Sequence, residues 1–178
     1  VLVKRGFTTN EIMVVLVTAI MDFPKSSQFV NALRSRHPEI TTVVQNVNNK
    51  FTSLILGEDS RVLYGKGYIE ENLCGFRFRI SPKAFYQINP IQTEVLYNKA
   101  IDFAELTGTE KVLDAYCGTG TIGIIASAKA GKVVGVELNS EAVKDAKVNA
   151  ELNNVKNIEF FEDDAGKFMV KSAQRGES

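Results

Sequence analysis

The feature that most constrains the fold is the stretch KVLDAYCGTGTIG at residues 111–123, in which an apolar run ending in an acid leads into a turn with three glycines. A short apolar run bounded by a turn is typical of a buried parallel strand, and the apolar residues after the turn can begin a helix. Glycine suits such a turn because side chains there would keep a ligand away from the backbone amides. The stretch therefore predicts a strand at 111–115, a ligand-binding loop and a helix.

The same alternation continues to the end of the chain. Further strands are predicted at 133–137 and 158–161, with helices at about 121–130, 140–153 and 165–171. All three strands end in or next to acidic residues. Because parallel strands deliver their carboxyl ends to one edge of a sheet, the pattern predicts an α/β, Rossmann-like sheet with a ligand site at that edge.

The first half of the chain has a different pattern. Residues 1–5 with 11–19, and 51–56 with 61–64, are predicted as hairpins, and further strands are predicted at 40–47, 66–69 and 74–80. A helix is predicted at 26–36, with Ser26 or Ser27 as its N-cap. These elements predict a mixed, mainly antiparallel α+β lobe over residues 1–90. Residues 91–178 then form the first part of the Rossmann-like domain.

A connector joins the two halves and leads into one more helix. Residues 80–90 contain two prolines and no helical period, and a helix is predicted at about 91–105. The residues predicted to face the core from this helix are Val95, Leu96, Ala100 and Phe103. In the connector, Phe85 alternates with Gln87 and Asn89, and spacing alone predicts that Phe85 belongs to the core.

Composition excludes several classes of protein. Lys+Arg and Asp+Glu are both 21, so bulk charge gives no support for nucleic-acid binding. The cysteines, Cys74 and Cys117, and the single histidine, His37, have no metal-ligand spacing, so no metal site is expected. The apolar run 12–21 is about half as long as a membrane span and is predicted as a buried strand. A cytoplasmic protein without a membrane partner is expected, and the first residue, Val1, suggests a piece of a longer chain.

The glycine loop is compatible with two cofactors. Gly118, Gly120 and Gly123 match the dinucleotide fingerprint, and Glu137 follows Gly118 by 19 residues, where a ribose-binding acid belongs. An NAD-linked oxidoreductase therefore stays open. Two features favour S-adenosylmethionine (SAM) instead: a helix and a connector precede the first strand, and the acid after the third strand suits an adenine amino group.

Four motifs together resemble one family. FYQIN at 85–89, LDAYCGTG at 113–120, VGVE at 134–137 and FEDDA at 161–165 are similar to those of the bacterial SAM-dependent RNA uracil-C5 methyltransferases, which make 5-methyluridine in ribosomal or transfer RNA. The resemblance covers nearly the whole chain. It implies SAM as cofactor and RNA as partner, with ribosomal RNA expected ahead of transfer RNA. A non-catalytic RNA-binding module remains a further alternative.

The resemblance also implies roles for individual residues. Glu137 would accept hydrogen bonds from the ribose hydroxyls, Asp164 would bind the adenine edge, and Phe85 would lie near the flipped target uracil, in contrast to its core position expected from spacing. The residues implied to form the cofactor pocket are Gln87, Tyr116, Gly118, Gly120, Thr121, Glu137 and Asp164.

The chain departs from the family in what it lacks. In the family, an Asp-Pro-Pro-Arg-type loop, a nucleophilic cysteine and a general-base glutamate follow the third strand, whereas this sequence ends at Ser178 before any of them. Neither cysteine matches the nucleophile, because Cys117 lies in the cofactor loop and Cys74 begins a predicted strand. The amino-terminal RNA-binding barrel and iron–sulfur cysteines are missing as well. No catalytic residue is therefore predicted in this chain, which alone is expected to be inactive.

Overall fold

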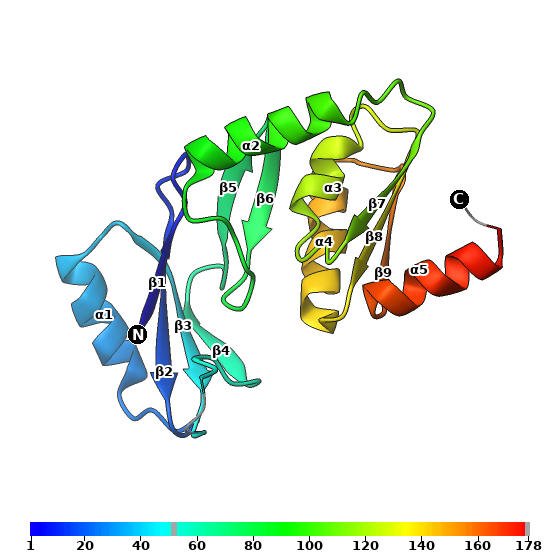
Figure 1. Cartoon of the computed structure of the whole chain (residues 1–178). Helices are drawn as coiled ribbons and strands as arrows, with labels where there is room; N and C mark the ends of the chain where they lie inside the picture. Colours follow the sequence, from blue (N-terminus) through cyan, green and yellow to red (C-terminus); the bar gives the residue numbers. More distant parts are fainter. Residues whose placement is uncertain (51–52, 177–178) are drawn as a thin grey trace. The chain divides into compact units, whose positions relative to one another are not determined.

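The computed structural model describes residues 1–50 and 53–176, which form two compact units (Figure 1). The first unit comprises residues 1–71 and 80–83, and the second comprises residues 72–79 and the chain from residue 84 onward. The predicted domain boundary at residue 90 assigned residues 72–79 and 84–90 to the first lobe, whereas their contacts group them with the second unit.

The first unit is built on a four-stranded sheet in the order β1-β2-β3-β4. Strands β1 (Leu2–Arg5) and β2 (Ile12–Thr18) form the predicted antiparallel hairpin, and β3 (Ile40–Val47) pairs with β4 (Ser60–Tyr64) antiparallel. Strands β2 and β3 are parallel, because helix α1 (Ser26–Arg36) connects them as a crossover. The sheet is therefore mixed and mainly antiparallel, as predicted.

Three local predictions for this unit are wrong. The strand predicted at 66–69 is one, because residues 66–68 form a turn and the strand there is β5 (Ile69–Leu73). Residues 53–56 form no strand, and residues 51–52 lie outside the described part of the chain. Asparagine side chains hold this segment instead: the Asn48 Nδ2 donates to the Leu54 and Ile55 carbonyls, and Asn46 binds the Gly57 backbone at both its N–H and its carbonyl. The segment is therefore a loop, since side-chain amides replace the ladder of a strand.

Helix α1 is also capped differently from the prediction. Its N-cap is Lys25, in the left-handed conformation with φ +61°, and no side chain caps the helix. Neither Ser26 nor Ser27 precedes the first helical residue, so neither can occupy the N-cap position that was expected of them.

The hairpin of β5 (Ile69–Leu73) and β6 (Phe76–Ile80) follows. Cys74 lies in the turn of this hairpin, with φ +49°. The prediction that a strand begins at Cys74 is wrong, because β6 begins at Phe76. The Cys74 backbone N–H donates to the Glu94 carboxylate at 2.6 Å, which ties this turn to the next helix.

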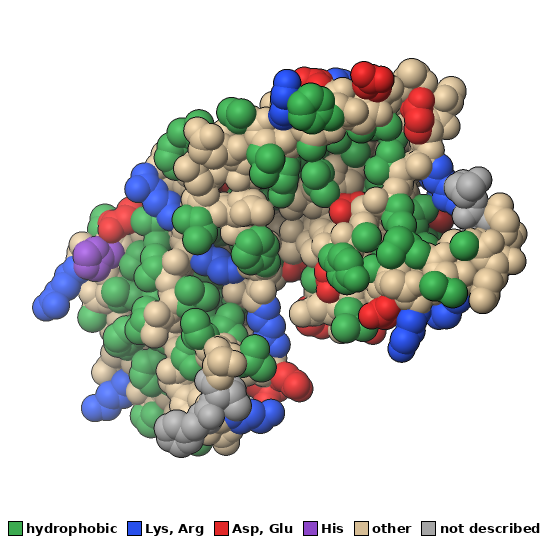
Figure 2. Space-filling model, viewed as in Figure 1, with side chains coloured by type: hydrophobic (Ala, Val, Ile, Leu, Met, Phe, Trp, Pro, Cys, Tyr) green, Lys and Arg blue, Asp and Glu red, His purple; other side chains and the backbone are tan. Residues whose placement is uncertain are grey.

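Helix α2 (Pro90–Phe103) has Asn89 as its N-cap, and the Asn89 side chain accepts a hydrogen bond from the Gln92 N–H. The prediction of its buried face is wrong, because Val95, Leu96 and Phe103 are exposed and apolar side chains gather on its outer surface (Figure 2). The residues that this helix turns inward lie at i, i+4 and i+8, and they are Thr93, Tyr97 and Ile101.

The remaining elements form the predicted Rossmann-like sheet. Strands β7 (Lys111–Ala115), β8 (Lys132–Glu137) and β9 (Ile158–Glu162) are parallel, in that order. Helices α3 (Thr121–Ala126) and α4 (Ser140–Leu152) lie on one face, and α5 (Ala165–Gln174) lies on the other (Figure 1). The carboxyl ends of all three strands therefore share one edge.

The core between the sheet and α3 and α4 includes side chains of the hairpin. Leu73 and Phe78 are buried in the same cluster as Ile124 and Ala146. The Phe160 ring from β9 lies against Gly135, where a Cβ atom would approach its Cδ1 to 2.4 Å. Glycine in β8 therefore makes room for this ring.

Candidate ligand-binding site at the carboxyl edge of the sheet

The loop at residues 116–120 connects β7 to α3 at the carboxyl edge of the sheet. Three of its residues have positive φ: Tyr116 at +61°, Gly118 at +55° and Gly120 at +77°. The Cys117 N–H donates to the Val136 carbonyl at 3.0 Å, and the Gly120 N–H donates to the Cys117 carbonyl at 2.8 Å. These bonds fix the loop between the ends of β7 and β8.

The carboxylate of Glu137 joins this loop to the end of β8. Its Oε2 accepts a hydrogen bond from the Gly118 N–H at 3.0 Å, and its Oε1 accepts one from the Asn139 N–H at 2.9 Å. Each oxygen retains a further lone pair, since a carboxylate can accept about four hydrogen bonds. Glu137 therefore shapes the loop and can still accept hydrogen bonds from a ligand.

Asp114, at the end of β7, is a second carboxylate beside the loop. Its Oδ2 accepts a hydrogen bond from the Gly123 N–H at 2.9 Å. Burial raises the pKa of Asp114 to about 6; the Gly123 hydrogen bond opposes this shift, and the negative charge of Glu137 adds to it. A cationic ligand beside Asp114 would stabilise its ionised form.

A pocket of about 180 Å³ opens next to the loop. It is formed by the connector before α2, by α2 itself and by the loop between β7 and α3. Its lining contains five residues that the sequence resemblance implicates in binding: Phe85, Gln87, Tyr116, Gly118 and Thr121. The pocket therefore brings together segments that lie about thirty residues apart in the sequence.

Two aromatic side chains at this pocket are solvent-exposed. Phe85 is 74% exposed and Tyr116 is 70% exposed. The expectation from spacing that Phe85 belongs to the core is wrong, because the connector has no regular secondary structure and carries its ring outward. Exposed aromatic rings beside a pocket can stack on a planar ligand.

The other predicted residues lie elsewhere at the same sheet edge. Gly120 packs against Phe160 and does not line the pocket. Glu137 does not line it either, but its carboxylate accepts a hydrogen bond from Gly118, which does. Asp164 is the N-cap of α5, where its Oδ1 accepts from the Lys167 N–H at 2.9 Å, and it lines a separate hollow.

Asp114 and Tyr97 are among the lining residues that had no predicted role. Asp114 was part of the recognised motif, and Tyr97 lies on the inward face of α2. The Tyr97 pKa is raised by burial, and a hydrogen bond to the Gln87 side chain opposes the shift. The i, i+4 spacing of Thr93 and Tyr97 places both on one side of the helix but does not tell from the sequence that this side is the buried one.

The cysteines have the properties of unreactive thiols. Burial raises the pKa of Cys117 to about 12, and the charges of Asp114 and Glu137 add to the shift. The Cys74 pKa is also raised, mainly by burial and then by Glu94. Because the thiolate is the nucleophilic form, neither environment activates its cysteine.

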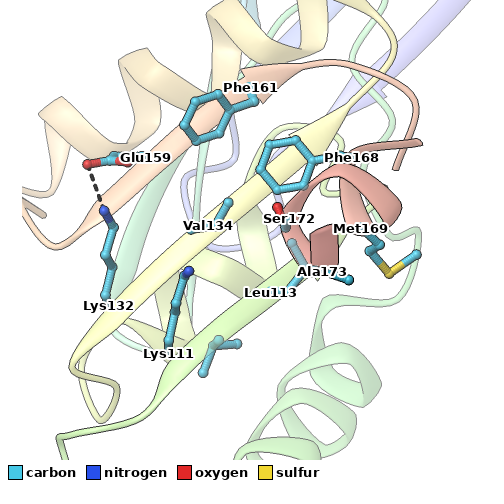
Figure 3. A pocket seen from close by; sticks show the side chains of 11 residues that line it. Lys111, Leu113, Lys132, Val134, Glu159, Phe161, Phe168, Met169, Ser172 and Ala173 are labelled. Carbon is cyan, nitrogen blue, oxygen red and sulfur yellow. Dashed lines mark ion pairs between the residues drawn. The ribbon is translucent and has the colours of Figure 1, made fainter. Parts of the chain in front are cut away.

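A second hollow, of about 250 Å³, lies on the opposite face of the sheet beneath α5 (Figure 3). The rings of Phe161 and Phe168 approach one another there, with centroids 5.3 Å apart, and Lys132 forms an ion pair with Glu159. No predicted binding residue lines this hollow. It lies beside the strands rather than beyond their carboxyl ends, where ligands bind in open α/β sheets.

Over residues 1–50 and 53–176, no group of three or more His, Cys, Asp and Glu side chains is arranged to hold a metal ion. Within the same residues, no helix has the length and apolarity needed to cross a bilayer.

Comparison with known proteins gives consistent matches. Residues 106–176 match a family described as a methyltransferase domain. An uncharacterized RNA methyltransferase of Oceanobacillus iheyensis is 42% identical over 176 residues, which are 99% of this chain and 38% of that protein. One of Clostridium tetani is 43% identical over the same lengths. The chain thus spans about two fifths of the length of these relatives.

Solved structures agree with the fold. The tRNA (uracil-54, C5)-methyltransferase of Pyrococcus abyssi, determined with S-adenosyl-L-homocysteine, has a TM-score of 0.71 and 30% identity, and the match covers 89% of this chain and 37% of that one. Trm5b of Pyrococcus abyssi, at a TM-score of 0.55 and 20% identity over 88% and 46% of the two chains, shares the fold alone. The predicted Rossmann-like methyltransferase fold is confirmed.

Proposed function

We propose that this chain carries the cofactor-binding part of a SAM-dependent RNA methyltransferase. The observation that supports this most directly is the pocket at the end of β7, where a glycine loop, the Asp114 carboxylate and two exposed aromatic rings meet, and where Glu137 binds the loop backbone. SAM as the cofactor agrees with the methyltransferase-domain match and with the S-adenosyl-L-homocysteine with which the Pyrococcus neighbour was determined.

The residues present fit this cofactor. Gly118 lets a ligand approach the loop backbone, because a Cβ atom there would project into open space. Glu137 has lone pairs left that would accept from ribose hydroxyls, and the Asp114 carboxylate in the pocket lining would favour a cationic ligand such as SAM. SAM supplies an electrophilic methyl group on its sulfur. In this proposal Asp164 binds the adenine edge, as the resemblance implies.

We further propose that the parent enzyme methylates C5 of a uridine. The four motifs that resemble uracil-C5 methyltransferases support this, as does the similarity to the Pyrococcus tRNA (uracil-54, C5)-methyltransferase. The exposed rings of Phe85 and Tyr116 suit stacking on a base turned out of an RNA helix. Ribosomal RNA as the target stays a prediction, and the nucleophilic cysteine and general base are expected outside this sequence.

The first test is calorimetric titration of this chain with SAM, S-adenosylhomocysteine and NAD. Binding of the adenosyl ligands that weakens in Glu137→Ala supports the proposal. Binding of NAD instead would favour the oxidoreductase alternative. RNA binding without any adenosyl ligand would favour a non-catalytic module.

The uridine-C5 assignment needs a longer protein. This chain can replace the matching segment of the Oceanobacillus relative, with the unaltered relative as the positive control. RNA labelled with tritium at C5 of uridine releases its label when that carbon is methylated. Methyl transfer without tritium release would rule out C5, and parallel assays on unmodified ribosomal and transfer RNA would identify the substrate.

A further inference from the structure

Asn149 on α4 and Asn153, the C-cap residue of this helix, bind one edge of β6 as a neighbouring strand would. The Asn153 Oδ1 accepts from the Arg77 N–H at 2.9 Å, and its Nδ2 donates to the Arg77 carbonyl at 2.7 Å. One helical turn earlier, Asn149 makes the same pair of bonds to Arg79, at 2.8 and 3.4 Å. Because Arg77 and Arg79 are two residues apart, their backbone groups face the same way, toward α4.

Asn149 makes one contact that Asn153 does not make. Its Nδ2 also donates to the Thr119 carbonyl at 3.1 Å, in the middle of the loop between Gly118 and Gly120. Asn149 is fully buried, on the same side of α4 as Ala146. An amide in an apolar helical face is costly unless its hydrogen bonds are made, so this side chain has a defined position.

We propose that Asn149 is a positioning residue that ties the ligand-binding loop to β6. One side chain holds both the Thr119 carbonyl and the Arg79 backbone, so the loop cannot shift relative to β6 without breaking at least one bond of Asn149. The order of the loop and the attachment of β6 are therefore coupled. The effect on adenosyl-ligand affinity rests on the proposed function, whereas the coupling itself does not.

The pair of asparagines supplies a matched control. Asn149→Ser and Asn153→Ser each remove one pair of hydrogen bonds to β6, but only Asn149→Ser removes the hydrogen bond to the loop. In the ligand-free variants, hydrogen exchange at the Gly118 and Gly120 amides reports the loop, and exchange in β8 reports global stability. We expect these two loop amides to exchange about tenfold faster in Asn149→Ser than in Asn153→Ser, relative to β8. Equal loop exchange in the two variants would overturn the proposal.

The unaltered protein provides a second measurement that does not depend on a variant folding. Native-state exchange at increasing urea concentration groups amides that open together. We expect the Gly118, Gly120 and Arg79 amides to open in one step, with the same urea dependence. Opening of the loop amides in a separate, easier step, with the Arg79 amide still protected, would contradict the coupling.

Ligand affinity gives the third readout. Titration with S-adenosylhomocysteine should show about a tenfold rise in Kd for Asn149→Ser and less than about a twofold rise for Asn153→Ser. Equal losses would overturn a positioning role in binding. Failure of the unaltered chain to bind the ligand would contradict the proposed function, and the two exchange measurements would still decide whether Asn149 holds the loop.

Discussion

The Glu137 carboxylate at the end of β8 accepts a hydrogen bond from the Gly118 N–H, 3.0 Å away, in the loop that leaves β7. The other oxygen of Glu137 accepts from the Asn139 N–H, just before α4. One acid therefore fixes a loop on the neighbouring strand and the start of the helix that follows its own strand. The glycine loop is shaped by this side chain as well as by its own backbone.

Replacing Glu137 should weaken adenosyl-ligand binding in a graded way. Alanine removes both acceptors, whereas glutamine keeps one acceptor oxygen. Hydrogen bonds to charged groups contribute about 1.5–3 kcal/mol each, so we expect Kd for S-adenosylhomocysteine to rise about 100-fold in Glu137→Ala and about tenfold in Glu137→Gln. Glu159→Ala is the control, because Glu159 is an exposed acid paired with Lys132. Calorimetry that finds no difference between the two alanine variants would contradict the role of Glu137.

The two loop glycines should respond differently to alanine. At Gly120, with φ +77°, a Cβ atom would lie 2.7 Å from Cζ of Phe160 and 3.1 Å from Cβ of Ala146. At Gly118, with φ +55°, it would meet nothing within 4 Å. We expect Gly120→Ala to lower the free energy of unfolding by about 2–4 kcal/mol and Gly118→Ala by about 1 kcal/mol.

Ligand binding should separate the same two variants. Gly118 lines the pocket, so its added methyl group should reduce adenosyl-ligand affinity even though the protein stays folded. Urea denaturation followed by calorimetry measures both effects. A Gly118→Ala protein that binds the ligand as tightly as the unaltered chain would show that the ligand does not approach this backbone.

Asp114 should make the stability of the fold depend on pH. Its pKa is raised from 3.8 to about 6. The unfolded chain therefore releases this proton first, and the contribution of Asp114 to the free energy of unfolding falls as pH rises from about 4 to about 6. At about 1.4 kcal/mol per pH unit, the effect is bounded at about 3 kcal/mol.

The variant Asp114→Asn isolates this effect, because the amide oxygen can still accept from the Gly123 N–H and cannot ionise. Urea denaturation between pH 4 and pH 7 should show the variant gaining stability relative to the unaltered protein as pH rises. Other carboxylates, such as Glu110 with a pKa lowered to about 2, cancel in this difference. A difference that is constant with pH would contradict the raised pKa.

Neither cysteine should act as a nucleophile in this chain. With a pKa of about 12, roughly one Cys117 thiol in ten thousand is ionised at pH 8. Iodoacetamide labelling followed by peptide mass spectrometry should therefore leave Cys117 unmodified in the folded protein and label it in urea. Rapid labelling of the folded protein, or methylated RNA formed by this chain alone, would contradict the expectation that the nucleophile lies elsewhere.

Most of the fold could be predicted because its elements are local patterns. Strand β7 and strand β3 have the predicted bounds, and α4 and β9 differ from prediction by one residue at one end. The loop at 116–120 could be found because glycine and a preceding apolar strand are themselves the physical requirements of such a turn. The meeting of the strand-end acids at one edge of the sheet could be predicted because parallel strands all run in the same direction.

What could not be predicted depends on packing between distant segments. The prediction of the inward face of α2 was wrong because Val95, Leu96 and Phe103 are more apolar than Thr93 and Tyr97, yet they are exposed. The loop at residues 53–57 was predicted as part of a hairpin because the sequence pattern does not show that the Asn46 and Asn48 side chains satisfy its backbone groups.

The sequence by itself determined the kind of site: a glycine loop after a buried strand, with acids at the carboxyl edge of a parallel sheet. Only the tertiary structure decided which side chains meet there. It placed Phe85 and Gln87 beside Tyr116 and left Asp164 at a separate hollow. The physical reason is that periodicity reports the environment each residue prefers, whereas contacts such as Asn149 with the Thr119 carbonyl arise from the packing of whole elements.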